Sequence, residues 1–183
     1  MMMKKKNNQN MENNLLFHVV HIDSPLGKIE LIADAENITS ILFIDTENNS
    51  HQSLLPTNTT TDELIKCSTQ LQEYFEGKRT TFDIQLKMMG TDFQKQVWQK
   101  LTEIAFGTTK TYSEQTVALG DIKAIRAVAA ANGKNKISII IPCHRVIGKD
   151  GSLTGYAGDL WRKKWLLNHE QKLTNTIAKG KLF

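Results

Sequence analysis

The sequence contains little cysteine and no long apolar run. Its two cysteines, Cys67 and Cys143, cannot form the disulfide framework that holds small secreted domains together. Neither belongs to a CxxC pair and the five histidines are scattered, so we expect no metal site and no cofactor. No stretch approaches the roughly 20 apolar residues that cross a bilayer, so we expect no membrane association. One of the cysteines remains a candidate nucleophile.

The N-terminal end lacks the apolar stretch of a signal peptide. Lys4, Lys5 and Lys6 are followed by Asn-rich polar sequence. We therefore expect residues 1–14 to be a disordered tail and the protein to be cytoplasmic. The apolar fraction of 40% is ordinary, and 183 residues suffice for one large domain or two small ones.

Charge divides the chain into two halves. Residues 1–90 hold 8 basic and 12 acidic side chains, a net charge of −4, whereas residues 91–183 hold 15 and 7, a net charge of +8. A basic C-terminal half suits a polyanion such as nucleic acid. Charge alone also fits a Lys-rich solvated surface, so both interpretations stay open here.

The N-terminal half predicts a small α/β scaffold domain over residues 15–90. Apolar and alternating segments separated by turns indicate an antiparallel β-meander from Leu16 to Ile44. A helix is expected from Thr61 to Glu76, with Cys67 on it as a small half-buried hydrophobe. Phe82–Leu86 is interpreted as a further strand, and residues 45–60 as a loop.

A second domain is expected over residues 91–172, followed by a tail over residues 173–183. Thr91 and Gln94 form a capping-box pattern at the start of a helix. Phe93, Val97 and Leu101 recur at helical spacing, so we expect all three to be buried.

The next segments have the layout of a helix-turn-helix. Tyr112–Leu119 and Lys123–Ala131 are interpreted as two helices joined by a tight turn at Gly120. The second helix is rich in alanine, so its backbone can approach a groove closely, and Lys123 and Arg126 can contact DNA. A helix packed inside a bundle explains the alanines equally well.

The strongest chemical signal is a cysteine after a proline. Ile137–Ile141 reads as a short buried strand, and Pro142 then turns the chain, so Cys143 lies on a rigid corner. His144 and Arg145 follow it and can lower the pKa of the thiol, whose thiolate is the reactive form. A buried cysteine with charged neighbours in solvent is the alternative.

A longer set of motifs resembles a known family. The matching segments are Phe93–Trp98, Gly107–Ser113, Ala124–Val128, Ala131–Asn135, Pro142–Gly148, Gly151–Gly158 and Arg162–Glu170. In order and spacing they resemble the O6-alkylguanine-DNA alkyltransferase family, whose members are methylated-DNA–protein-cysteine methyltransferases, and in particular its bacterial broad-specificity branch. The resemblance is close over residues 90–170 and weak before them.

The resemblance implies an α+β fold with a ribonuclease H-like N-terminal domain and a mainly helical C-terminal domain with a winged-helix-like helix-turn-helix. It implies DNA repair by irreversible, stoichiometric alkyl transfer after nucleotide flipping, without a cofactor. The implied partner is double-stranded DNA that contains O6-alkylguanine, and the implied state is a monomer. O4-alkylthymine is a second expected substrate.

The resemblance also implies catalytic roles for five residues. Cys143 is the alkyl acceptor, His144 the base that acts through a water, and Glu170 the carboxylate that orients His144. Tyr112 donates toward guanine N3. Asn135 is the hinge between the helix-turn-helix and the active-site segment.

Further implied roles concern the DNA and the base pocket. Arg126 is the arginine finger that fills the space of the flipped nucleotide. The expected DNA contacts beside it come from Lys123, Ala127 and Ser113. The expected pocket residues are Val146, Tyr156, Ala157, Gly158 and Ser138.

Several positions depart from the family pattern. Lys136 and Ser138 replace prolines that many members have, which implies a looser segment and a roomier pocket. Asp159 replaces a usual glycine, and its charge is expected to weaken contact with phosphates. Trp161 and Trp165 are expected to pack in the core.

Three other functions remain to be weighed. A non-enzymatic module that binds alkyl lesions carries tryptophan where this chain has Cys143. A thiol hydrolase also needs an oxyanion hole, and no signature of one appears. A transcriptional regulator needs base-reading side chains, whereas the second helix offers mostly alanine.

Overall fold

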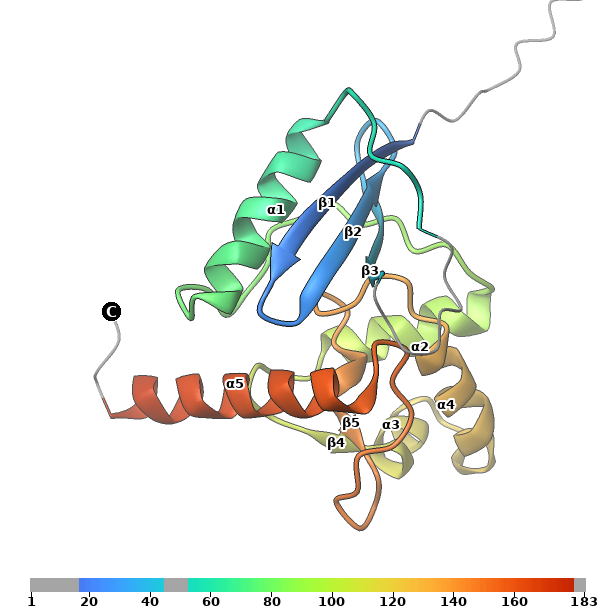
Figure 1. The fold of residues 1–183 in the computed structure, drawn as a ribbon. Helices are drawn as coiled ribbons and strands as arrows, with labels where there is room; N and C mark the ends of the chain where they lie inside the picture. Colours follow the sequence, from blue (N-terminus) through green and yellow to red (C-terminus); the bar gives the residue numbers. More distant parts are fainter. Residues whose placement is uncertain (1–16, 45–52, 180–183) are drawn as a thin grey trace, which may run out of the picture.

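The computed structural model describes residues 17–44 and 53–179. The predicted tail over residues 1–14 and part of the predicted loop over residues 45–60 lie outside these ranges. The fold is α+β, as the sequence predicted. In Figure 1 the sheet and α1 form the upper part of the molecule, α5 runs beneath α1, and α2, α3 and α4 lie to the lower right.

The N-terminal half is a three-stranded antiparallel meander covered by one helix. Strands β1 (His18–Ser24), β2 (Gly27–Ala33) and β3 (Ile38–Phe43) pair in the order β1-β2-β3. Helix α1 (Asp62–Phe75) contacts all three strands. Thr61 caps this helix, and Cys67 on it is fully buried rather than half-buried. The meander and the helix were both predicted correctly.

The predicted strand over Phe82–Leu86 is wrong. Residue Leu86 makes a single parallel bridge to Ile38, through hydrogen bonds from the Ile38 amide to the Gln85 carbonyl and from the Lys87 amide to the Ile38 carbonyl. The segment is extended and alternates between half-buried and exposed side chains, which explains the strand-like pattern. No ladder forms because the edge of β3 is shared with a second segment.

That second segment, residues 136–138, belongs to the C-terminal half and connects it to the sheet. The Ile41 amide donates to the Lys136 carbonyl at 2.7 Å, and the Ser138 amide donates to the Ile41 carbonyl at 3.0 Å. Ile139 then has a φ of 72°, and residues 138–140 form a turn. The predicted strand over Ile137–Ile141 is therefore wrong, because the chain leaves the sheet edge after one bridge.

The C-terminal half is mainly helical. Its elements are α2 (Asp92–Thr102), β4 (Lys110–Thr111), α3 (Tyr112–Ala118), the 3-10 turn η1 (Ile122–Ala124), α4 (Ile125–Gly133), the 3-10 turn η2 (Cys143–Arg145), β5 (Val146–Ile147) and α5 (Leu160–Ala178). The short strands β4 and β5 pair in parallel. The predicted capping box at Thr91 and Gln94 is present, whereas Phe93 is 40% exposed and not buried as expected.

Helix α5 joins the two halves. The Arg162 guanidinium donates from Nε to the Leu26 carbonyl at 2.7 Å, and His169 Nε2 donates to the Tyr74 carbonyl at 2.8 Å. The helix continues to Ala178, so residues 173–178 are helical rather than part of the predicted tail. Among the described residues no helix is long and apolar enough to cross a membrane.

Candidate active site and DNA-binding surface

Cys143 lies at the start of η2, where Pro142 turns the chain. The residue is only 8% exposed, and its Sγ accepts a hydrogen bond from Asn135 Nδ2 at 3.2 Å. The same amide group donates to the Ile141 carbonyl at 2.8 Å, and its oxygen accepts from the Ile137 amide at 2.9 Å. Asn135 therefore holds the turn that presents the thiol.

Two groups oppose the cost of ionising the thiol. Burial raises the pKa of Cys143, while the hydrogen bond from Asn135 and the positive charge of Lys163 lower it. Burial also lowers the pKa of Lys163 to about 8, and its Nζ donates to the Thr154 carbonyl at 2.7 Å. Lys163 was not among the predicted site residues, although its helical spacing from Leu166 and Glu170 places it on the same buried face of α5.

The next residue, His144, is fully buried and bound to Glu170. Its Nε2 lies 2.9 Å from Glu170 Oε1, and because an ionised carboxylate only accepts, Nε2 carries the proton. The other ring nitrogen, Nδ1, is buried and has no hydrogen-bond partner among the described residues. Burial lowers the pKa of His144, against the hydrogen bond to Glu170. The imidazole is thus neutral near pH 7, with Nδ1 as its basic atom.

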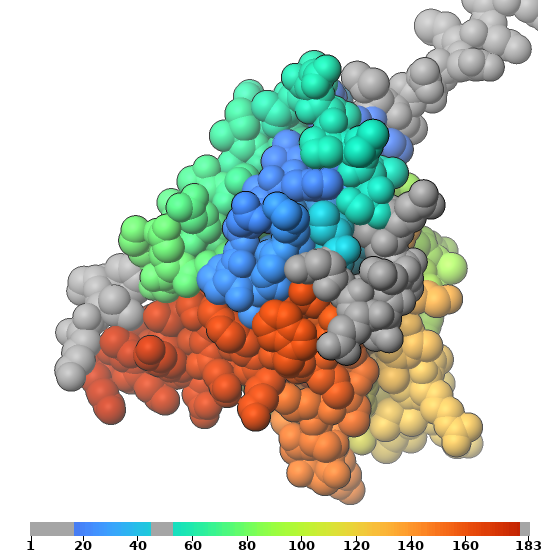
Figure 2. Space-filling model, viewed as in Figure 1, coloured from blue at the N-terminus to red at the C-terminus, as the bar shows by residue number. Residues whose placement is uncertain are grey.

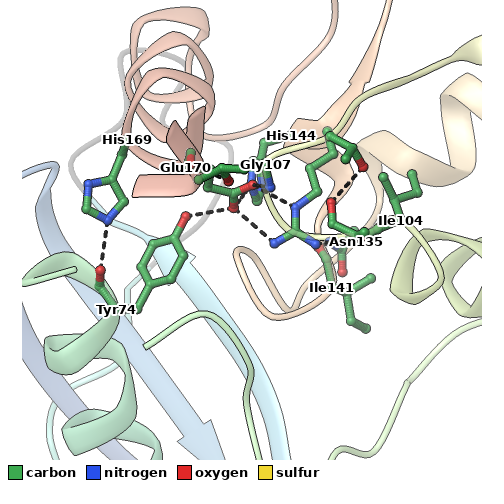
Figure 3. Close-up of polar contacts among 12 residues, drawn as sticks. Tyr74, Ile104, Gly107, Asn135, Ile141, His144, His169 and Glu170 are labelled. Carbon is green, nitrogen blue, oxygen red and sulfur yellow. Dashed lines mark hydrogen bonds and ion pairs between the residues drawn. The ribbon is translucent and has the colours of Figure 1, made fainter. Parts of the chain in front are cut away.

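Glu170 is the centre of a buried network, which Figure 3 shows. Its two oxygens accept five hydrogen bonds, which come from Tyr74, His144, the Gly107 amide and two nitrogens of Arg145. Burial opposes its charge, yet the hydrogen bonds from His144 and Arg145 hold the pKa of Glu170 below its ordinary value. The carboxylate is therefore ionised and fixed in orientation.

Arg145 does not serve the thiol in the way the sequence suggested. Its guanidinium donates twice to Glu170, at 2.9 Å and 3.0 Å, and once to the Ile104 carbonyl at 2.6 Å. It also lies over the Phe106 ring, 5.6 Å from the centroid. The side chain is committed to the carboxylate, so Lys163 is the cation that lowers the pKa of Cys143.

The predicted base-pocket residues surround this corner unevenly. The Tyr112 hydroxyl lies 3.2 Å from the Thr154 carbonyl and 3.4 Å from the Gly155 carbonyl, to which it can donate. Val146, Tyr156 and Ser138 are buried. The backbone of residues 154–158 thus forms a loop beside the phenol of Tyr112.

The same loop packs against the N-terminal half. Ala157 is exposed, whereas Gly158 is buried, and a Cβ at Gly158 would lie 2.6 Å from Phe43 Cδ2. A cleft of about 300 Å³ lies between the two halves at this point. Asn135, Ser138, Ala157 and Gly158 line it from the C-terminal side. Cys143 does not line this cleft. Asn135 lines it and donates a hydrogen bond to the Cys143 sulfur, so the cleft lies one residue away from the thiol.

The helix-turn-helix lies away from the three-stranded sheet, to the lower right in Figure 1. Arg126, Lys123 and Ala127 are exposed, and Ser113 is half-buried. Val128 and Ala131 are buried on the opposite face of α4, which packs on α2 and α3. Figure 2 shows α4 and the preceding turn (yellow) at the lower right of the molecular surface. Small residues therefore lie on both faces of α4. On one face they pack against α2 and α3, and on the other they leave a surface that DNA can approach closely.

Three expectations for the start of α5 need correction or refinement. Asp159 is buried, has a φ of 66° and forms an ion pair with Arg162 at 2.7 Å, so its charge is neutralised rather than directed at phosphates. Trp161 is 49% exposed and lies against the Arg162 guanidinium, so its predicted core packing is wrong. Trp165 is half-buried and stacks on His169, with centroids 4.7 Å apart.

A basic helix-turn-helix beside a buried thiol with a histidine–carboxylate pair defines a DNA-binding protein with a nucleophilic cysteine. Two family models match the chain. Residues 18–88 match the 6-O-methylguanine DNA methyltransferase ribonuclease-like domain, and residues 92–172 match the DNA-binding domain of the same family. The chain belongs to the 6-O-methylguanine DNA methyltransferase family.

Relatives and solved structures agree. A methylated-DNA–protein-cysteine methyltransferase of Methanosarcina barkeri is 43% identical over 152 residues, which cover 82% of this chain and 94% of that protein. The constitutive enzyme of Bacillus subtilis is 42% identical over 153 residues, covering 81% and 92%. A crystal structure of Mycobacterium tuberculosis OGT in complex with DNA has a TM-score of 0.74 at 40% identity, covering 85% of this chain and 94% of that one.

Proposed function

We propose that this protein repairs DNA by moving an alkyl group from the O6 atom of guanine irreversibly onto Cys143. The chain is a methylated-DNA–protein-cysteine methyltransferase of its family, and DNA is its substrate. The observation that carries the residue assignment is the pairing of a hydrogen-bonded thiol at Cys143 with a buried histidine–carboxylate pair at the next residue.

His144 acts as the base. Glu170 keeps the proton on Nε2, which leaves the lone pair of Nδ1 to accept the thiol proton through a bridging water. Lys163 and Asn135 stabilise the thiolate that remains. The pair of electrons on Sγ then attacks the alkyl carbon, the bond from that carbon to guanine O6 breaks, and its electrons stay on the purine.

Tyr112 assists the leaving purine. As O6 departs, negative charge spreads over the ring, and a hydrogen bond from the Tyr112 hydroxyl to N3 stabilises it. The carbonyls of Cys143 and Val146 accept from the 2-amino group, and the Ala157 amide lies near O6. The product on the protein is a thioether, which water does not cleave, so each molecule acts once.

The DNA must present the base outside the helix. Arg126 on α4 enters the duplex in place of the flipped nucleotide, while Lys123, Ala127 and Ser113 lie against the backbone. Exposure of Arg126 and Lys123 supports this arrangement. Because such contacts are made to phosphates, the affinity for DNA should fall steeply as the salt concentration rises and should depend little on the base sequence.

The rest of the proposal concerns substrate range and state. Ser138, where many relatives have proline, leaves room for larger alkyl groups and for O4-alkylthymine. The protein acts as a cytoplasmic monomer with a scaffold domain over residues 15–90 and a catalytic domain over residues 91–172. Sedimentation with and without DNA measures the state, and transfer from O4-methylthymine duplexes measures the range.

The decisive experiment is intact mass after mixing with a duplex that contains one O6-methylguanine. We expect a gain of one methylene that saturates at one equivalent, maps to Cys143 and is absent in Cys143→Ala. The matched control is Cys67→Ala, which should still be methylated at Cys143. Burial raises the pKa of Cys67 to about 12, so its thiol stays protonated and is not the acceptor. Tight binding of the lesion without any mass gain would leave a damage-recognition module instead.

A further inference from the structure

The carboxylate of Glu170 receives one hydrogen bond from the N-terminal half. The Tyr74 hydroxyl, on α1, donates to Oε1 at 2.9 Å, and Oε1 is also the oxygen that binds His144 Nε2 at 2.9 Å. Tyr74 is fully buried. None of the proposed catalytic roles involves Tyr74. Its hydroxyl and the His144 ring nevertheless bind the same oxygen of Glu170.

We propose that Tyr74 is a positioning residue for alkyl transfer, whose hydroxyl fixes Glu170 and limits how strongly that carboxylate attracts the proton of His144. The N-terminal half then sets the basicity of the active-site histidine. The inference rests on the roles proposed for His144 and Glu170.

The hydroxyl is held in place from several directions. The backbone carbonyl of Tyr74 accepts from His169 Nε2 at 2.8 Å, so one residue of α1 binds two consecutive residues of α5, as Figure 3 shows. Its ring lies 5.6 Å from the Phe82 ring, 6.2 Å from the Phe106 ring and 5.2 Å from the His169 ring. Contacts from both halves of the chain thus leave the phenol little freedom to turn away from Oε1.

The charged groups around His144 and Glu170 come from two elements, η2 and α5. His144 experiences Glu170, Arg145 on η2 and Lys163 on α5. Glu170 in turn accepts from His144, Arg145, the Gly107 amide and Tyr74. Of these side chains, Arg145 is charged and His144 can take up a proton, whereas the Tyr74 hydroxyl is a donor that stays neutral.

The phenol keeps its proton at all physiological pH values. Burial and the nearby Glu170 raise the pKa of Tyr74 well above its ordinary value. Its hydrogen bond therefore spreads part of the carboxylate charge onto a donor that never ionises. Without it, Oε1 would be more basic, would stabilise the imidazolium and would raise the pKa of His144.

The test is Tyr74→Phe, which keeps the ring and removes the hydroxyl. We expect the pKa of His144, followed by NMR without DNA, to rise by about half a unit. The acid limb of the single-turnover transfer rate should move up equally, so the rate falls about threefold on that limb and stays unchanged on the plateau. The NMR titration remains informative even if transfer to Cys143 were not observed.

The matched control is His169→Phe, which removes the hydrogen bond from His169 to the Tyr74 carbonyl but keeps the bond between the Tyr74 hydroxyl and Glu170. It should lower the free energy of unfolding and leave the His144 titration in place. Tyr74→Phe in a Glu170→Gln background should no longer move that titration. Incorporation of 3-fluorotyrosine at position 74 makes the hydroxyl a stronger donor and should shift the pKa of His144 downward. An equal loss of rate at every pH, with an unmoved His144 titration, would overturn the proposal.

Discussion

The side-chain amide of Asn135 lies 3.2 Å from the sulfur of Cys143, and the same nitrogen binds the carbonyl of Ile141 at 2.8 Å. One amide thus connects the end of the helix-turn-helix segment, the turn before Pro142 and the reactive atom. Its oxygen completes the arrangement by accepting from the Ile137 amide. The geometry of the corner and the pKa of the thiol consequently depend on one buried side chain.

Asn135→Ala should therefore impair both stability and reactivity. It leaves the buried Ile137 amide without this partner, at about 1–3 kcal/mol, whereas the Ile141 carbonyl keeps its hydrogen bond from the Cys143 amide. It also removes a donor to the thiolate, so the pKa of Cys143 should rise. Urea unfolding and the pH dependence of iodoacetamide labelling measure the two effects. Asn168→Ala, at an exposed position of α5, is the control and should change neither.

Lys163→Met should slow alkyl transfer and change how stability depends on pH. The pKa of Lys163 in the folded protein is about 8, below its ordinary value of 10.5. Between these values the unfolded chain binds more protons, so the parent protein gains stability as the pH rises from 8 to 10.5. The variant should lack this gain in urea titrations at pH 7 and pH 9.5. Lys164→Met, at an exposed neighbour, should behave like the parent.

Glu170→Gln should destabilise the protein at neutral pH by about 3–5 kcal/mol, because Arg145 would lose its buried counter-charge. The folded pKa of Glu170 is depressed, so its contribution is complete above the unfolded value of 4.5 and is lost as the pH falls below it. Between pH 6 and pH 3 the variant should accordingly lose less stability than the parent. Glu103→Gln, on the surface, is the control, and an acid response identical to the parent in Glu170→Gln would contradict this account.

Gly158→Ala should disturb the contact between the loop over residues 154–158 and β3. The added Cβ would lie 2.6 Å from Phe43 and 2.9 Å from Tyr156, at a cost of about 1–3 kcal/mol. Thermal unfolding measures the loss, and Phe43→Leu in the same chain should recover part of it. Gly133→Ala is the matched control, because a Cβ there meets nothing within 4 Å.

Arg126→Ala should separate lesion extrusion from DNA binding. We expect the rate of transfer from duplex DNA to fall by roughly tenfold or more, because the extruded state loses the side chain that fills the vacated space. Transfer from the free base, O6-methylguanine, should be unchanged. Lys172→Ala, on the exposed face of α5, provides the control. An equal loss with duplex and free base would show that Arg126 supports the fold rather than the DNA.

The sequence predicted regular elements and the corner at Cys143 well, because periodicity, capping residues and proline act locally. The meander, the helix at Thr61 and the Thr91 capping box depend on neighbours in the chain. Residues 82–86 and 137–141 have strand-like patterns, but a ladder also needs a free edge, and both compete for β3. Which segment pairs with β3 depends on tertiary structure, so it cannot be predicted from the local sequence pattern.

The same limit applies to the site. Arg145 beside Cys143 in sequence suggested a cation for the thiol, yet Glu170, 25 residues later, binds it. The charge of Lys163 lowers the pKa of Cys143 because α5 packs on η2, which carries the thiol. Tyr74 precedes Glu170 by 96 residues, so no sequence motif indicates the hydrogen bond between them. Adjacent residues give the reacting atoms, whereas their electrostatic partners come from distant segments.

The close approach of Gly158 to Phe43, together with the hydrogen bond from Arg162 to the Leu26 carbonyl, has a consequence for protein engineering. Both halves shape the interface at which they meet, so they are not interchangeable modules. A chimera that joins the first ninety residues of one relative to the remainder of another must import matching partners for residues 43 and 158. A chimera joined near residue 90 should therefore be active only when the contacting surfaces of its two halves come from the same parent.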